Sequence, residues 1–245
     1  MNELDVNGNR SELSEPKKKR FEWLRKLFQI ILTVVLLITI AGGAYFLILN
    51  QTNTLVVVVG DSMYPTLHDK EFGLMSTKSK HLDNIERDDI IIFYDPRHEA
   101  IPDKIDNLSE EQLKTIPQLI KRVIALPNET IQFFDGGNEL DTIQITKADG
   151  AIFTYENNFP RGYYVYKENE NGSGAPFELG NDEYFVLGDN LSQSLDSRSA
   201  NIGAVNKSII NGVLYVIQGT STGSDAQGRL TGKQYYMLWN WRYFK

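Results

Sequence analysis

The chain has 245 residues, enough for one well-buried core plus a short membrane anchor. Its formal net charge of -7, with no run of Lys or Arg beyond residue 26, argues against a nucleic-acid partner. The absence of cysteine excludes disulfides, thiolate catalysis, cysteine-ligated metals and a lipid-modified cysteine.

A basic tail precedes a long apolar run. Residues 1–20 are polar, lack an apolar period and end in four consecutive basic residues, so we expect residues 1–26 to form a disordered tail. From Leu27 to Leu49 the chain has 23 residues without a charge, long enough as a helix to cross a hydrocarbon layer of about 30 Å. The sequence therefore predicts one transmembrane helix over residues 27–49.

Charge bias predicts how this helix is oriented. Seven of the 25 Lys and Arg residues precede it, and the first Lys or Arg after it is Lys70. Because cytoplasmic flanks carry the excess of positive charge, we expect a cytoplasmic N-terminus and an extracytoplasmic domain from residue 50 onward. A cleavable secretory signal ending between Ala41 and Ala44 is the alternative, although the apolar run is longer than the roughly 7 to 15 residues of such signals. A fully buried soluble helix is a third alternative.

The part after the helix is expected to be mainly β. Residues 50–54 are predicted as a short polar link. β-branched and aromatic runs bounded by turn residues then predict strands at 55–59, 90–94, 119–126, 130–134, 163–166, 184–187 and 209–218. One short helix is expected over residues 109–113, because Ser109 can cap it and Gln112 occupies the reciprocal position of a capping box.

Residues 50–218 are predicted to form the extracytoplasmic domain, with two surface inserts at 95–118 and 136–180. The second insert carries strand-like pieces, so we expect it to form a smaller β unit. Residues 219–233 are rich in Gly, Ser and Thr and are predicted as a linker. An aromatic tail ends the chain, and its side chains suit either a membrane interface or the edge of a core.

A serine in a sharp turn is the first candidate for chemistry. The segment Gly60–Leu67 follows a strand, and its Gly and Pro favour a turn that presents Ser62. Taken alone this is a weak signal, because a serine in such a turn is more often structural. A nucleophilic serine needs a base, and the histidines lie in polar or loop-like stretches typical of solvated side chains, namely His68, His81 and His98.

Lys121 is a better candidate base because it lies inside an apolar run. In a strand, Leu119, Lys121 and Val123 share one face, and Arg122 lies on the other. Burial on an apolar face disfavours the ammonium and lowers its pKa from about 10.4, so that a neutral amine can accept a serine proton. The alternative is that Lys121 reaches water or an ion pair. Because the two residues lie on opposite faces of the strand, the apolar face of this strand must carry either Lys121 or Arg122.

A third segment combines a turn with a polar cluster. A strand leads into Gly-Asp-Asn at residues 188–190, and the following loop carries Ser192, Ser194, Asp196, Ser197 and Arg198. Such a loop can orient a neighbouring amine. On its own the pattern is more typical of a hydrogen-bonded loop with an Asp and Arg pair.

Behind a single N-terminal span, these segments together resemble the bacterial type I signal peptidases. The matching segments are SMYPTL at 62–67, DDIIIF at 88–93, IKRVIALPNE at 120–129 and GDNLSQSLDSR at 188–198. The resemblance covers roughly residues 20–218. It implies a mainly β, signal-peptidase/LexA-like fold, with a strand-rich catalytic core and a smaller inserted β unit behind one N-terminal transmembrane helix.

The resemblance also implies a Ser-Lys dyad, with Ser62 as nucleophile and Lys121 as general base, and neither a cofactor nor a metal. Ser194 then orients the lysine, and Asp196 and Arg198 stiffen the loop without reacting. The main-chain N–H of Ser62 is the expected oxyanion donor. Some relatives add a hydroxyl two residues before the nucleophile, a position occupied here by glycine.

By the same resemblance, the substrate is an extended signal peptide bound by strand addition, with small side chains at the first and third positions before the cut. The residues expected to contact it are Val58, Val59, Gly60, Asp61, Met63, Leu67, Leu119 and Ile120. The apolar members are equally typical of plain core. Expected partners are signal peptides of exported precursors and the lipid bilayer, without nucleic acid or metal.

Four positions depart from the usual family pattern. Asp88, Ala125 and Asn128 replace glycines, and Leu191 replaces an arginine, which indicates altered loop packing without loss of a reacting group. The function that we expect is that of a membrane-bound serine endopeptidase, which removes signal peptides at the outer face of the cytoplasmic membrane.

Two other functions fit parts of the same pattern. The first is that of a catalytically inactive signal-peptidase-like assembly partner for surface structures, which would be marked by loss of Ser62 or Lys121. An autoproteolytic Ser-Lys regulator is the nearest rival among enzymes, but those proteins are soluble and would not need the apolar span.

Overall fold

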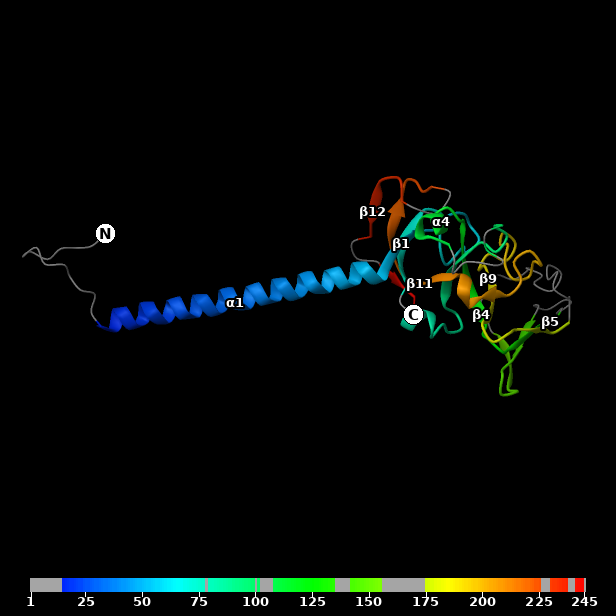
Figure 1. The fold of residues 1–245 in the computed structure, drawn as a ribbon, viewed down its shortest axis with the longest axis horizontal. Coiled ribbons are helices and arrows are strands. Elements are labelled where there is room, and N and C mark those ends of the chain that lie inside the picture. Colours follow the sequence, from blue (N-terminus) through cyan, green and yellow to red (C-terminus); the bar gives the residue numbers. More distant parts are fainter. Residues whose placement is uncertain are drawn as a thin grey trace, which may run out of the picture. The chain divides into compact units, whose positions relative to one another are not determined.

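The computed structural model describes residues 15–77, 79–99, 101, 108–134, 142–155, 175–225, 230–237 and 241–244. The chain divides into two compact units, Met1–Gln51 and Thr52–Lys245. The long helix α1 (Glu15–Thr52) supplies the described part of the first unit, and all described strands belong to the second (Figure 1).

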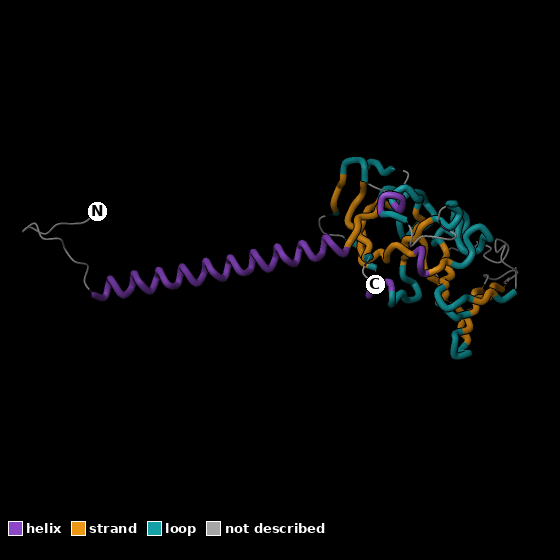
Figure 2. Tube along the Cα trace, in the orientation of Figure 1, coloured by secondary structure: helices purple, strands orange, loops and turns teal. Residues whose placement is uncertain are grey.

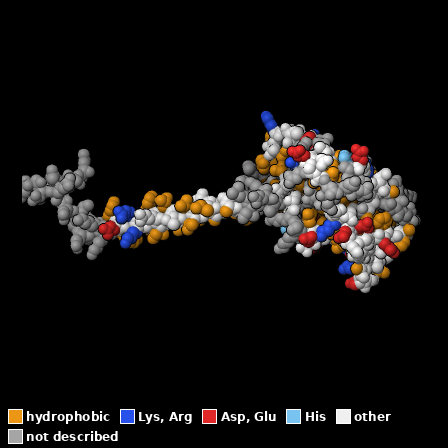
Figure 3. Space-filling model, viewed as in Figure 1, with side chains coloured by type: hydrophobic (Ala, Val, Ile, Leu, Met, Phe, Trp, Pro, Cys, Tyr) orange, Lys and Arg blue, Asp and Glu red, His pale blue; other side chains and the backbone are white. Residues whose placement is uncertain are grey.

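Helix α1 is long and apolar enough to cross a membrane. Within its segment Phe21–Tyr45, an 18-residue window has a mean hydropathy of 2.3, and none of that window is buried against protein. Figure 3 shows apolar side chains along this segment and basic side chains near its N-terminal end. The helix begins within the expected polar tail, where Pro16 is tolerated in the first turn and Lys and Arg are good helix formers. It also continues to Thr52, into the expected polar link.

Two antiparallel sheets make up the second unit (Figure 2). In the larger one the strand order is β1-β2-β11-β3-β4-β9-β10, and β12 and β13 also pair with β11. Its strands are β1 (Asn53–Val57), β2 (Glu71–Ser76), β3 (Ile90–Tyr94), β4 (Gln118–Ala125), β9 (Glu183–Leu187), β10 (Val205–Asn206), β11 (Ile210–Ser221), β12 (Gln234–Tyr236) and β13 (Arg242–Tyr243).

The smaller sheet has the order β7-β6-β5-β8. Its strands are β5 (Thr130–Phe134), β6 (Thr142–Thr146), β7 (Ile152–Tyr155) and β8 (Phe177–Glu178). The short helices with described bounds in the second unit include α2 (Ser79–Leu82), α4 (Glu110–Leu113) and the 3-10 turn η2 (Lys207–Ile209). Figure 1 shows β5 and β12 at opposite ends of this unit.

Much of the predicted secondary structure is confirmed. The unit is mainly β, β3 and β5 have the predicted bounds, and the small sheet contains the extra strands expected within residues 136–180. The capping box also forms, since the Ser109 N–H donates to Gln112 Oε1 at 2.9 Å and the Gln112 N–H donates to Ser109 Oγ at 3.3 Å. The strand predicted at 163–166 lies outside the described residues.

Strand β2 was not expected, because Gly73 interrupts its apolar pattern. The glycine is required by a close backbone approach: a Cβ there would lie 2.0 Å from the carbonyl oxygen of Val216, where the pairing of β2 with β11 shifts register. The predicted end of β11 was also too early. The strand runs on to Ser221, into the stretch expected to be a linker, because tail strands pair with it.

The larger sheet carries apolar clusters on both faces. Along β3, Ile91 and Phe93 belong to one cluster and Ile90 and Ile92 to another, as strand alternation requires. A third cluster joins β4 and β9 to the small sheet, with Phe133 and Phe185 among its members. The central strands are therefore covered on both sides, and a polar group that they carry is kept from water.

Candidate active site

The turn that follows β1 presents Ser62. Gly60 adopts a left-handed φ of 82°, and its N–H donates to Asp69 Oδ1 at 2.9 Å, which fixes the start of the turn. Met63 and Leu67 are completely buried and anchor the turn to the apolar cluster on the Ile90 face of the sheet. Ser62 itself is partly exposed, so the turn places this hydroxyl where a substrate can reach it.

Lys121 comes from strand β4 and meets the serine. Its Nζ lies 2.8 Å from Ser62 Oγ and donates to the carbonyl oxygen of Ile120 at 2.9 Å. The residue is only 3% exposed, on a strand whose neighbouring side chains are apolar. Among the described residues no carboxylate lies within ion-pair distance of this amine. The two residues are separated by 59 positions in sequence, and the fold brings them into hydrogen-bond contact.

The environment of Lys121 favours its neutral form. Burial is the largest effect and lowers its pKa from 10.5 to about 8. The carboxylates of Asp196 and Asp189 attract the ammonium and oppose this change, while the guanidinium of Arg198 adds to it. About one-tenth of the amine is therefore unprotonated at pH 7, and about half at pH 8.

The adjacent Arg122 is accommodated in the opposite way, by pairing. Its Nε and Nη2 donate to the two carboxylate oxygens of Asp189 at 2.8 and 2.6 Å, and both side chains are largely buried. Its Nη1 donates to the main-chain oxygen of Asp88 at 2.8 Å. Of the two cations in this strand, the arginine stays charged and paired, whereas the lysine has no acidic partner among the described residues.

The Gly-Asp-Asn turn holds the serine from the other side. The Asn190 N–H donates to the carbonyl oxygen of Ser62 at 3.0 Å, and Asn190 Nδ2 donates to that of Asp61 at 3.0 Å. At Gly188 an added Cβ would lie 2.2 Å from Ser194 Oγ and 2.5 Å from the Ser62 oxygen, so only glycine fits. Sequence reasoning identified this turn but missed its contacts with the serine, for which the local pattern carries no signal.

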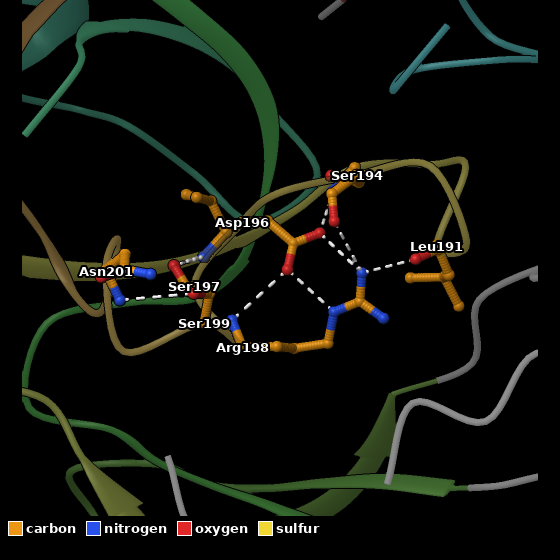
Figure 4. A network of polar contacts seen from close by, with 9 residues as sticks. Leu191, Ser194, Asp196, Ser197, Arg198, Ser199 and Asn201 are labelled. Atoms are coloured by element: carbon orange, nitrogen blue, oxygen red, sulfur yellow. Dashed lines mark hydrogen bonds and ion pairs between the residues drawn. The ribbon is translucent and has the colours of Figure 1, made fainter. Parts of the chain in front are cut away.

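A buried ion pair shapes the loop after this turn (Figure 4). Asp196 Oδ1 accepts from Arg198 Nε at 2.8 Å, and Asp196 Oδ2 accepts from the Gly188 N–H at 3.0 Å. Arg198 Nη2 in turn donates to the carbonyl oxygen of Leu191 at 2.7 Å. Both charged side chains are almost completely buried, so the pair fixes the main chain of the loop rather than facing a substrate.

Ser194 lies beside Gly188 with its hydroxyl buried. Within the described part of the chain Ser194 Oγ has no hydrogen-bond partner, so the expected orienting bond to Lys121 is not formed. The loop main chain is nevertheless tied down, because the Ser194 carbonyl oxygen accepts a long bond of 3.4 Å from Arg198 Nη2. The hydroxyl can act as a donor and as an acceptor at the edge of the site.

The eight residues expected to contact substrate fall into three groups. The buried members of one apolar cluster are Val58, Met63 and Leu67. Leu119 and Ile120 are partly buried, and they pack against clusters on opposite faces of the sheet. The exposed residues, on the chain leading to Ser62, are Val59, Gly60 and Asp61. A peptide can reach the exposed group directly, whereas the first group is core.

Backbone geometry explains two of the four departures from the family pattern. Asp88 and Asn128 have φ values of 73° and 63°, in the left-handed region that favours glycine and that Asp and Asn tolerate. The Asp88 carboxylate also accepts a hydrogen bond from the Tyr155 hydroxyl of β7. Ala125 is buried where β4 shifts register against β9, and Leu191 is buried in the cluster next to the small sheet.

The arrangement can carry out nucleophilic catalysis. It places a hydroxyl against a buried amine, and the N–H of Ser62 donates to no acceptor within the described residues. Among those residues, no group of three or more His, Cys, Asp or Glu side chains is placed to hold a metal ion.

Comparisons with known proteins point to one family. A family model described as signal peptidase, peptidase S26, matches residues 27–217. Signal peptidase I S of Bacillus subtilis (strain 168) is 28% identical over 203 residues, which cover 83% of this chain and 91% of that protein. Signal peptidase I of Bacillus licheniformis is 30% identical over 197 residues, covering 80% and 87%.

A crystal structure of a signal peptidase I from Enterococcus faecalis V583 is also similar, at 24% identity. It covers 54% of this chain and 97% of its own, with a TM-score of 0.34, a value too low to add to the family match.

Proposed function

Since the chain belongs to the signal peptidase family, peptidase S26, and is a serine endopeptidase of the type that removes signal peptides, we propose that Ser62 is its nucleophile and Lys121 its general base. The observation that carries the proposal is the 2.8 Å separation between Ser62 Oγ and Lys121 Nζ. It is supported by the burial that lowers the pKa of the lysine to about 8.

Acylation begins with neutral Lys121. Its Nζ accepts the hydroxyl proton of Ser62 while Oγ attacks the carbonyl carbon of the scissile bond. The oxyanion that forms lies against the Ser62 N–H, which has no acceptor within the described residues. Collapse of the intermediate breaks the C–N bond, and the Lys121 ammonium protonates the departing amine. The mature protein leaves, and the signal peptide stays bound to Ser62 as an ester.

Deacylation repeats the same steps with water. Lys121, neutral again, takes a proton from a water molecule that attacks the ester carbonyl. The second intermediate collapses, the proton returns to Ser62 Oγ, and the signal peptide is released as a carboxylic acid. Ser194, whose hydroxyl has no partner within the described residues, is a candidate to receive a hydrogen bond from the amine during these steps.

We further propose that the catalytic unit lies outside the cytoplasm, with the N-terminal tail inside. Lys and Arg are concentrated near the N-terminal end of α1 and are absent for 20 residues after Leu49, in keeping with the positive-inside bias. Ser62 follows the end of the helix by ten residues, and a chain of that length spans at most about 35 Å. The covalent link therefore keeps the nucleophile near the membrane, where the cleavage site of a precursor emerges.

Substitutions test the dyad. Ser62→Ala and Lys121→Ala should each abolish cleavage of a signal-peptide substrate in detergent, with circular dichroism unchanged. Ser208→Ala and Lys207→Ala remove a serine and a lysine that lie outside the site and should retain full activity. Activity in either dyad variant comparable to these controls would disprove the assignment. An inactive assembly partner would show no cleavage in the wild type either.

The lack of cysteine offers two sharper tests. Lys121→Cys can be alkylated selectively with 2-bromoethylamine, and the resulting lysine analogue should restore cleavage if an amine at this position is the base. For the orientation, Ser11→Cys and Ser208→Cys carry the single thiol on opposite sides of α1. A membrane-impermeant maleimide applied to spheroplasts should label only Ser208→Cys, and labelling of only Ser11→Cys would reverse the proposed topology.

A further inference from the structure

The end of the chain lies beyond the family match, which stops at residue 217, yet it is built into the larger sheet. Strand β13 pairs with β11 at Val216 and Ile217, and β12 pairs with it from Gly219 to Ser221. Strand β2 occupies the other edge of β11 over the same stretch. On the edge of β11 opposite β2, the pairing with β3 ends at Leu214, and the tail strands pair with the residues that follow. Figure 1 shows β12 beside β11.

Apolar side chains of the tail reach the anchors of the nucleophile turn. Met237 and Phe244 pack against the cluster that contains Met63 and Leu67. Main-chain bonds fix both tail residues, because the Met237 N–H donates to the carbonyl oxygen of Gln218 at 2.7 Å and the Phe244 N–H donates to that of Tyr215 at 2.8 Å. The tail thus packs on the same apolar surface that supports the turn.

Arg242 connects the tail to the turn itself. Its Nη1 donates to the carbonyl oxygen of Thr66 at 2.6 Å, and its Nη2 pairs with Glu71. The Glu71 side chain is only 10% exposed, and its Oε2 also accepts the main-chain N–H of His68 at 2.9 Å. This arginine therefore holds two main-chain groups of the turn. It binds the carbonyl oxygen of Thr66 directly and the N–H of His68 through the carboxylate of Glu71.

We propose that Arg242 is a positioning residue for the nucleophile, holding the turn from Ser62 to His68 so that Ser62 Oγ stays within reach of Lys121. This inference rests on the proposed dyad. A second arginine also contacts the turn. Thr66 Oγ1 lies 3.5 Å from Nη2 of Arg122, on the strand that carries Lys121. A displacement of about 1 Å between reacting groups can lower a rate by about 100-fold, so a loosened turn should lower the rate of cleavage.

Arg242→Ala removes both contacts and should lower kcat for a signal-peptide substrate by roughly 10- to 100-fold, with KM within about twofold. Arg242→Lys keeps the charge but cannot satisfy the Thr66 oxygen and Glu71 with the same fork, so it should lie between wild type and Arg242→Ala. Full-length enzyme in detergent is used throughout, and thermal unfolding of each variant is recorded at the assay pH.

Two controls separate positioning from general stability. Lys207→Ala removes an ion pair to Asp83 outside the site, from a cation about as exposed as Arg242, and Tyr243→Ala truncates the exposed neighbour of Arg242 in β13. Both should retain wild-type kcat. If Arg242→Ala fails to fold, Arg242→Lys alone carries the test, with kcat reduced at least about threefold in a protein that unfolds at the wild-type temperature.

Failure of this inference is distinguishable from failure of the dyad. If Ser62→Ala is inactive but both Arg242 variants keep kcat within about twofold of wild type, the positioning role is disproved and the dyad stands. If Ser62→Ala cleaves substrate, the dyad itself is wrong. A fall in unfolding temperature with unchanged kcat would show that Arg242 is only structural.

Discussion

Replacing Lys121 by methionine should inactivate the enzyme and at the same time stabilise it at neutral pH. Lys121 is almost completely buried, and its burial lowers its pKa from 10.5 to about 8. Below pH 8 the folded protein must hold a buried ammonium that the unfolded chain exposes to water. Methionine has a similar length and no charge, so it removes this penalty.

The size of the effect follows from the difference in pKa. A tenfold change in acid dissociation is worth about 1.4 kcal/mol, so a change from 10.5 to about 8 corresponds to roughly 3 kcal/mol. Methionine also forfeits the contacts of Nζ with Ser62 and Ile120, worth about 1 kcal/mol each. A net gain of about 1 kcal/mol remains, equivalent to roughly 2 to 4 °C in unfolding temperature for a domain of this size.

The gain should depend on pH in a defined window. Because the folded pKa of Lys121 is lowered, the unfolded chain binds more protons than the folded one between about pH 8 and 10.5. Wild-type stability therefore rises with pH through this window, and the penalty is fully present below it. The advantage of Lys121→Met should be largest at neutral pH and should be lost before pH 10.5 is reached.

Thermal unfolding of the full-length protein in detergent, followed by circular dichroism from about pH 6 to about pH 10.5, measures this difference. Lys207→Met is the matched control, because the pKa of exposed Lys207 is raised by its bond to Asp83, so no stabilisation is expected. A Lys121→Met variant that is no more stable than wild type at neutral pH, or whose advantage does not change with pH, would refute a buried lysine with a lowered pKa.

Three further outcomes are expected. The kcat/KM of the wild type should fall about tenfold per pH unit below pH 8, because acid protonates Lys121, and a flat profile on both sides of pH 8 would exclude it as the base. Gly188→Ala should lower kcat by at least about 100-fold, since its Cβ would lie 2.2 Å from Ser194 Oγ, and wild-type kcat would contradict the close packing of this turn on the serine. Asp88→Gly should be more stable to thermal unfolding than Asp88→Ala by about 1 kcal/mol, because both lose the bond to Tyr155 but only alanine keeps the left-handed strain; equal stability would argue against that strain.

The sequence predicts local features well and long-range contacts poorly. The apolar strand around Lys121 and the Gly and Pro turn at Ser62 are local patterns, and both are present in the structure. Strand β2 was missed because Gly73 reads as a break, although the reason for the glycine is a neighbouring backbone far along the chain. Arg242 was missed for the same reason, since no pattern in the tail indicates a partner near residue 66.

The arginine next to Lys121 is neutralised by a residue of the Gly-Asp-Asn turn. Asp189 forms an ion pair with Arg122, and the N–H of the next residue, Asn190, donates to the carbonyl oxygen of Ser62. One short turn thus performs two tasks: its carboxylate pairs with the arginine instead of the lysine, and its asparagine fixes the main chain at Ser62. If Asp189 paired with Lys121 instead, the amine would stay protonated and could not accept the proton of the serine. The Gly-Asp-Asn turn therefore fixes the main chain at Ser62 and pairs its carboxylate with Arg122, while burial remains the main cause of the lowered pKa of Lys121.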